Sequence, residues 1–226
     1  MPLGGKPTLI DSFQPPIFSW ATTLHPHAAG LEAQIKSGET PVFAEVTPQY
    51  RGMAPDHPSL EPFYAMAERL DVPVGIHMGY GAPGGPYWVY PKYRAALGNS
   101  LLLEELLTRH PKLRLYVMHA GMPLIDEMIA LLFSHPQVYV DISADNWGVP
   151  RPEFNRHLRR LVEAGYSKRI MFGSDQMVWP QTIEVAVDSI ANADFLSSDQ
   201  KRDILYNNAA RFLRLTPEQI ARHHGR

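Results

Sequence analysis

Four short apolar segments of the chain carry an ionisable side chain at or near their end. His77 closes Val-Pro-Val-Gly-Ile-His, His119 closes Leu-Tyr-Val-Met-His, Asp141 lies in Val-Tyr-Val-Asp-Ile, and Asp175 follows Ile-Met-Phe-Gly-Ser. Burying such a group without a partner costs several kcal/mol, so four of them in similar positions indicate a common ligand. Imidazole and carboxylate groups together suit a divalent metal. We expect zinc first, with manganese or iron as alternatives, and one coordination position open to water.

Each of these residues also has a structural interpretation. A single histidine at the end of a strand can simply be a hydrogen-bonded structural residue. Asp175, in Gly-Ser-Asp, could equally cap the next helix. Asp141 is expected to be structural, because it lies inside its segment with Ser143 and Asp145 beyond it. The four residues as a set are therefore a stronger signal than any one of them.

The composition limits the classes of partner. The chain has 226 residues, 45% of them apolar, which suits one domain with a sizeable core. Its 21 basic and 23 acidic residues nearly balance, which argues against nucleic acid, an anionic membrane surface or a strongly charged partner. There is no cysteine, so metal or acid-base chemistry must come from histidine and carboxylate side chains. Since no apolar run reaches the roughly 20 residues of a membrane span, and no secretory signal is recognisable, we expect a cytoplasmic protein.

Apolar segments alternate with segments of helical period along most of the chain. Strands are predicted over residues 17–23, 42–46, 72–78, 113–118, 138–142 and 169–172, and helices over 31–36, 59–69, 99–109, 123–133, 152–164, 182–190 and 198–213. This alternation predicts an α/β fold with a parallel sheet. A doubly wound sheet and a (β/α)8 barrel both fit the pattern. The polar residues at the carboxyl ends of several separate strands favour the barrel.

The same residues resemble the amidohydrolase superfamily over residues 17 to 215. The similarity rests on the order of His77, His119-Ala-Gly-Met-Pro, Asp141, Gly-Ser-Asp175 and a closing Asn-Asn-Ala-Ala-Arg-Phe-Leu. The group that it resembles most includes aminocarboxymuconate-semialdehyde decarboxylase, resorcylate-type decarboxylases and metal-dependent lactone or amide hydrolases. The resemblance implies a TIM-barrel-like enzyme with a divalent metal. By position, His77 would be a metal ligand, His119 a catalytic proton-handling residue, and Asp175 both a metal ligand and the base for water.

Two reactions and one inactive state are open on this scaffold. We expect a hydrolase that opens a small carbonyl substrate, such as a lactone or an amide, with metal-activated water. The alternative is a non-oxidative decarboxylase of a small aromatic or unsaturated carboxylic acid. A third alternative is a truncated homologue with impaired catalysis. The sequence does not separate the two reactions, because both use the same metal ligands.

The sequence departs from this family at its beginning. The family opens on a strand that ends in His-x-His, whereas residues 1–16 are irregular and segment 17–23 corresponds to the third family strand. We therefore expect an incomplete barrel over 17–215 that lacks its first two strands, followed by a tail over 216–226. This would be a truncated product, or a chain that completes its barrel by swapping or dimerising, so a homo-oligomer is expected. His25 and His27 are candidate substitute ligands, with a solvent-facing loop pair as the alternative. Glu45 is a better inward-facing candidate, with an ion pair inside the barrel as its alternative.

The segment 79–98, after His77, is long for a simple connection. It is rich in glycine, proline, aromatic and basic residues, including Trp88 and Arg94. This composition predicts a lid over the site in which Arg94 or Lys92 pairs with a substrate carboxylate, or else a packed surface loop. Trp147 and Trp179 also lie beyond strand ends and are predicted to line the pocket.

Overall fold

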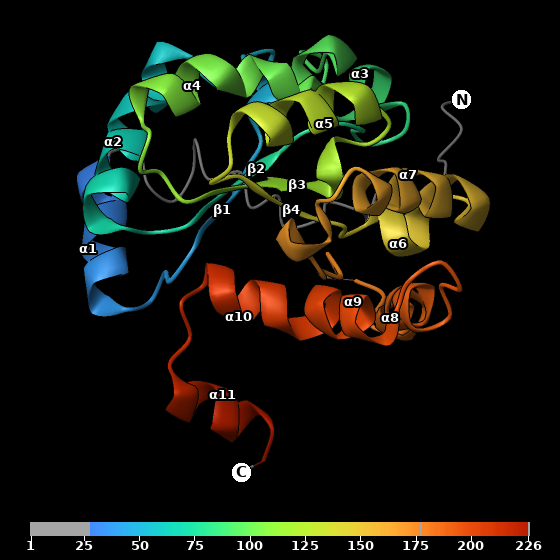
Figure 1. The fold of residues 1–226 in the computed structure, drawn as a ribbon. Coiled ribbons are helices and arrows are strands. Elements are labelled where there is room, and N and C mark those ends of the chain that lie inside the picture. Colours follow the sequence, from blue (N-terminus) through green and yellow to red (C-terminus); the bar gives the residue numbers. More distant parts are fainter. Residues whose placement is uncertain (1–27, 177, 226) are drawn as a thin grey trace, which may run out of the picture.

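A parallel five-stranded sheet forms the centre of the protein. The computed structural model describes residues 28–176 and 178–225, so His25, His27, the predicted strand 17–23 and the segment 1–16 lie outside the described residues. The strands lie side by side in chain order (Figure 1) and are β1 (Phe43–Val46), β2 (Val74–His77), β3 (Leu115–Met118), β4 (Tyr139–Asp141) and β5 (Ile170–Met171). A doubly wound sheet reverses its strand order at a switch point. These five strands show no reversal, which confirms the expected barrel-like α/β fold and leaves it incomplete over the described residues.

Helices cross between the strands and cover both sides of the sheet. Figure 1 shows α2, α4 and α5 on one side and α8, α9 and α10 on the other. The helices are α1 (Ala28–Ser37), α2 (Glu61–Leu70), α3 (Gly85–Trp88), α4 (Glu104–Arg109), α5 (Ile125–Ser134), α6 (Asp145–Gly148), α7 (Arg151–Glu163), α8 (Thr182–Ala191), α9 (Ser198–Arg202), α10 (Asn208–Phe212) and α11 (Pro217–His223).

The two faces of the sheet differ in chemistry. One face is aliphatic and fully buried, and consists of Val74, Ile76, Leu115, Val117, Val140 and Ile170. The strand register aligns His77 with Met118, Gly75 with Tyr116, and Tyr116 with Tyr139, so these residues share the opposite face. That second face carries His77 at the carboxyl ends of the strands and tyrosines deeper in the sheet. We call it the site face.

The helix α10 packs against the deep end of the site face. The ring of Phe212 lies 5.7 Å from the ring of Tyr116 and 4.9 Å from that of Tyr139, measured between centroids. In the same helix, the Asn208 side-chain amide donates to the carbonyl oxygens of Ser167 and Ile170. The closing Asn-Asn-Ala-Ala-Arg-Phe segment therefore fastens the C-terminal helices to the start of β5 and covers the tyrosines.

Several element boundaries differ from the sequence-based expectation. The segment 99–109 begins as a 3₁₀ helix, Ser100–Leu103, and Asn99 caps it by accepting the Leu101 N–H. The segment 198–213 is interrupted by a π-helix, Asp203–Asn207, and its N-cap is Ser197. The predicted tail contains α11, which a capping box starts at Thr216. Within the described part of the chain, no helix is long and apolar enough to cross a membrane.

Candidate functional site

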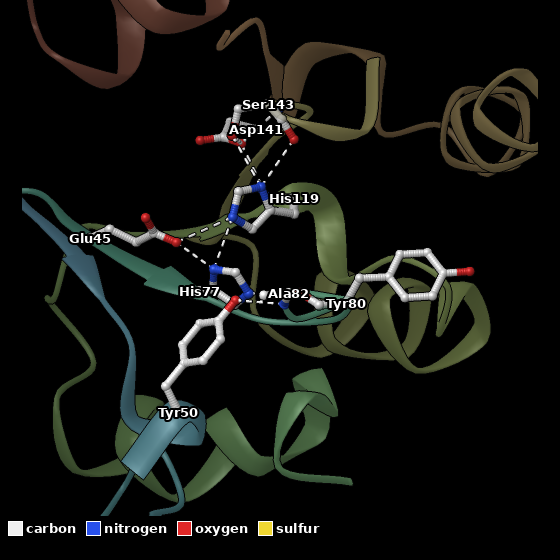
Figure 2. A network of polar contacts seen from close by, with 8 residues as sticks. All are labelled: Glu45, Tyr50, His77, Tyr80, Ala82, His119, Asp141 and Ser143. Atoms are coloured by element: carbon white, nitrogen blue, oxygen red, sulfur yellow. Dashed lines mark hydrogen bonds and ion pairs between the residues drawn. The ribbon is translucent and has the colours of Figure 1, made fainter. Parts of the chain in front are cut away.

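Three side chains from separate strand ends converge on one point of the site face. The Glu45 Oε1 atom contacts His77 Nδ1 and lies 3.2 Å from His119 Nε2, while the two ring nitrogens are 3.0 Å apart (Figure 2). Glu45 comes from β1, His77 ends β2, and His119 follows β3. We call these three residues the triad. Each offers one ligand atom to the same point, so the triad could hold a metal ion.

In each histidine of the triad, the ring nitrogen that faces away from Glu45, here called the outer nitrogen, makes a hydrogen bond that fixes the tautomer of the ring. His77 Nε2 lies 2.7 Å from the Tyr80 carbonyl oxygen, and His119 Nδ1 lies 3.0 Å from the Ser143 carbonyl oxygen (Figure 2). A carbonyl only accepts, so each outer nitrogen carries the proton that it donates. The inner nitrogens, His77 Nδ1 and His119 Nε2, then face Glu45, and each can offer a lone pair to a metal once any proton it carries has left. A histidine that donates its outer N–H to a carbonyl is the usual arrangement of a metal ligand.

The spacing of the triad also fits a metal. Four-coordinate zinc at about 2.0–2.1 Å from nitrogen and oxygen ligands places neighbouring ligand atoms roughly 3.3 Å apart. The triad has separations of 3.0 and 3.2 Å between His119 Nε2 and its two partners, together with the closer contact of Glu45 and His77. The donor set and its spacing therefore suit a divalent cation, with little movement needed to admit one.

The turn that carries His119 is held by Asp141. Asp141 Oδ1 accepts the backbone N–H of His119 at 3.1 Å, and also the backbone N–H and the hydroxyl of Ser143 at 3.0 and 2.6 Å. Ser143 in turn supplies the carbonyl that orients the His119 ring. These contacts agree with the interpretation of Asp141 as a structural residue.

Close backbone approach joins the loops that follow β2 and β3. Gly79 has φ +86°, and a Cβ atom at this position would lie 2.2 Å from the Met122 carbonyl oxygen. The same carbonyl accepts the Tyr80 N–H at 2.7 Å. Only glycine permits this approach. The loop that orients His77 is thereby fixed to the turn that carries His119.

Burial and close contact shift the pKa values of the triad in opposite directions. Burial opposes the ionised carboxylate, but hydrogen bonds from His119 and His77 bring the pKa of Glu45 well below its usual value. Burial likewise opposes a charged His119, but the Glu45 carboxylate outweighs it and raises the pKa of His119 to about 10. Burial, followed by the charge on His119, lowers the pKa of His77. In the metal-free protein at neutral pH, the Glu45 carboxylate is therefore ionised, and the His119 ring carries a second proton and a positive charge.

A pocket of about 600 Å³ opens above the triad. Its walls include His77, His119, Asp145, Asp175, and the aromatic rings of Tyr50, Tyr80, Trp147 and Trp179. The two indole rings lie edge to face, 6.3 Å apart, and the Trp147 Nε1–H donates to the Ser174 carbonyl. Such walls suit a flat, small organic molecule whose reacting group reaches the triad.

Two carboxyl groups in the pocket titrate near neutral pH. Burial is the main cause that raises the pKa of Asp175 to about 6, with the carboxylates of Glu45 and Asp141 adding to it. Burial also raises the pKa of Asp145 to about 7, and here too nearby carboxylates contribute. Groups whose pKa lies near the working pH are suited to proton transfer.

The structure brings together some of the sequence-predicted residues and separates others. Glu45 joins His77 and His119, while Asp175, Trp147 and Trp179 line the pocket above them. Among the described residues, the helix that follows Asp175 is α8, which begins at Thr182 with Gln181 as its N-cap, so Asp175 does not cap it.

The two residues predicted from the lid loop lie elsewhere. Trp88 is 68% exposed and, like Arg94, is not among the described residues that line the pocket. The Arg94 guanidinium donates to the carbonyls of Pro91 and Tyr93. The loop contains a short helix, α3, and presents Tyr80 to the pocket. The first part of this loop, residues 80–83, is thus the part that reaches the site.

Sequence reasoning did not select Asp145 and Tyr50 for the site. Asp145 lies four residues beyond Asp141, so its position after a strand was a usable signal. Tyr50 lies in a 3₁₀ helix after β1, and its ring stacks edge-on against His77 at 5.1 Å between centroids. Nothing in the local sequence distinguishes Tyr50 from a core aromatic residue.

Comparison with known proteins agrees with this architecture. The chain is 28% identical over 214 residues to gamma-resorcylate decarboxylase of Rhodococcus jostii (strain RHA1), an alignment that covers 81% of this chain and 59% of the relative. An uncharacterized TIM-barrel protein from Bordetella bronchiseptica superposes with a TM-score of 0.63 at 21% identity, covering 82% of this chain and 61% of that one. A probable 2-pyrone-4,6-dicarboxylic acid hydrolase from Acinetobacter baumannii gives 0.59 at 18% identity, with 84% and 69% covered.

These comparisons support different conclusions about the chain. The solved structures share the fold with this chain. The chain spans 59% of the length of the curated relative. A family model described as amidohydrolase matches residues 11–215, which include the triad, Asp175 and the closing Asn-Ala-Ala-Arg segment. The chain therefore belongs to the amidohydrolase family.

Proposed function

We propose that this chain carries the site of a metal-dependent hydrolase that acts on a small carbonyl substrate such as a lactone or an amide. The observation that carries the proposal is the triad, whose two histidines turn their inner nitrogens toward one point beneath a pocket that also holds Asp175. Glu45, His77 and His119 would hold a divalent metal, with zinc as the first choice and manganese or iron as alternatives. Asp175 is proposed as a further ligand and as the base.

The protein's own residues supply the acid-base chemistry. When bound, a divalent metal lowers the pKa of water from 15.7 toward about 7 and polarises a carbonyl group. Asp175 is ionised above its pKa of about 6 and can accept a proton in the pocket. Asp145 keeps its proton up to about pH 7 and can donate it to the leaving group. Trp147 and Trp179 would stack on a flat substrate and exclude bulk water.

A non-oxidative decarboxylase on the same site is the second candidate. It is supported by the 28% identity to gamma-resorcylate decarboxylase. The pocket favours the hydrolase, because the described residues that line it include neither lysine nor arginine. A carboxylic acid substrate would therefore depend on the metal alone to pair with its charge.

Metal content and product analysis test the proposal. The purified chain is loaded with zinc or manganese, desalted, and analysed for metal per chain. It is then assayed for ring opening on a lactone and amide panel and for carbon dioxide release on aromatic acids. We expect about one metal per chain and hydrolysis. Carbon dioxide release instead would select the decarboxylase, and a metal content well below one per chain would refute both reactions.

Matched variants locate the activity. Glu45→Gln is expected to lower metal content and turnover together, because it removes the only carboxylate of the triad. Asp175→Asn is expected to abolish turnover. Glu105→Gln makes the same chemical change as the first variant on the exposed surface of α4 and serves as the control. Full turnover in the Asp175 variant would contradict the assigned base. The expected homo-oligomer and cytoplasmic location stay predictions.

A further inference from the structure

A third histidine, His157, contacts the turn that presents His119. His157 belongs to α7, is only 6% exposed, and is not among the described residues that line the pocket. Its Nε2–H donates to the carbonyl oxygen of Ala120 at 3.0 Å. Ala120 is itself buried, so His157 satisfies a backbone acceptor that has no access to water.

The turn at His119 needs such support. His119 has φ +61° and Ala120 has φ +45°, in the left-handed region that non-glycine residues disfavour. Two consecutive residues of this kind persist only where surrounding contacts hold them. Asp141 holds the N–H of His119 on one side, and His157 holds the carbonyl of Ala120 on the other.

We propose that His157 is a positioning residue that sets the direction of the His119 ring. The Ala120 carbonyl belongs to the Ala120–Gly121 peptide, so its contact with His157 fixes that peptide. Through Ala120, this contact holds the backbone from which the His119 ring projects toward Glu45 and His77. Burial lowers the pKa of His157 to about 4, so the neutral ring keeps the single proton that Nε2 donates. The role rests on the proposed metal site for its function, but the geometry of the ring is measurable without a metal.

The competing explanation is that His157 only fills space beneath α7. Two variants of equal length separate the explanations. His157→Gln places an amide N–H at the same number of bonds from Cα as Nε2, whereas His157→Met offers no donor there. Leu161→Ala is the control, because Leu161 is fully buried on the same helix and its truncation weakens packing without changing the contact to Ala120.

The decisive readout is the His119 ring in the metal-free protein. Nuclear magnetic resonance of ¹⁵N-histidine-labelled protein reports the Nδ1–H of His119 that donates to Ser143. We expect this exchange-protected signal in the wild type, in His157→Gln and in Leu161→Ala, and its loss in His157→Met. The signal of His110, a buried histidine held between Glu61 and Glu68, should stay unchanged in all four proteins.

Metal affinity supplies the second readout. Titration with Co²⁺ should show a loss of about 10- to 100-fold in His157→Met, the range found for groups that orient a ligand, and recovery in His157→Gln. If His157→Met keeps both the His119 signal and the wild-type affinity, the proposal is wrong. If His157→Met does not fold, His157→Asn takes its place, because its shorter amide does not reach Ala120.

The two proposals fail in different ways. If the wild-type protein does not bind Co²⁺, the proposed metal site is refuted, but the His119 signal still decides whether His157 has the positioning role. If the wild-type protein binds Co²⁺ and the His119 Nδ1–H signal is unchanged in His157→Met, only the positioning role is refuted.

Discussion

Stability below neutral pH should depend on His157. Burial lowers the pKa of its ring from the ordinary 6.5 to about 4, so the folded state binds fewer protons than the unfolded state between these values. The contribution of the neutral ring to the free energy of unfolding is therefore fully present above pH 6.5 and is lost as the pH falls toward 4. Acid should weaken the fold through this residue.

The size of the effect follows from the two pKa values. At about pH 5 the unfolded ring is almost fully protonated and the folded ring is still mostly neutral, which corresponds to a loss of about 2 kcal/mol relative to about pH 7.5. The glutamine side chain of His157→Gln does not titrate, so this variant lacks that pH-dependent loss of stability. Asp145 and Asp175, whose raised pKa values act with the opposite sign, are present in both proteins and cancel in the difference.

Urea unfolding of wild type and His157→Gln at both pH values measures the effect. The stability advantage of the wild type over the variant should shrink by about 2 kcal/mol on going from about pH 7.5 to about pH 5. A difference that stays constant between the two pH values would show that His157 is not held neutral by burial, and the reasoning would fail.

Three further outcomes are expected. Metal uptake near neutral pH should release about one proton per chain and become stronger as the pH rises, because His119 carries a proton that a metal ligand must lose. Calorimetry in buffers of different ionisation enthalpy measures the number of protons released. Binding heats that do not depend on the buffer would contradict the prediction. Asp141→Ala should cost about 3 kcal/mol in urea unfolding because it strands the buried donors of Ser143 and the His119 turn, and an unchanged midpoint would count against it. Phe212→Ala should cost about 3–5 kcal/mol because α10 loses its contact with the site face, whereas Phe133→Ala, at an 83% exposed position, should cost almost nothing.

Much of the fold could be predicted from local pattern. The described strands are short apolar segments separated by helices, and their order in the sheet repeats their order in the chain, as a barrel requires. The predicted strand β2 and helix α7 lie within two residues of their observed ends. The π-helix in 203–207 could not be predicted, because an interruption of this kind depends on what the helix packs against.

The lid prediction shows the limit of composition. Aromatic and basic residues in 79–98 indicated a lid, but composition does not say which side chains point inward. The structure places Tyr80 at the pocket, while Arg94 contacts the carbonyls of its own loop. The pairing of Arg94 with a substrate carboxylate stays a prediction, and the described lining of the pocket does not support it.

The sequence by itself determined that His77, His119 and Asp175 end or follow strands and so meet at one edge of a parallel sheet, because strand ends are visible in local apolar runs. Only the tertiary structure decided that Glu45 completes the triad and that each ring turns its inner nitrogen toward it. Those features depend on the register of β1 against β2 and on backbone carbonyls from distant loops. Such contacts join residues far apart in the chain and leave no periodic signal in it.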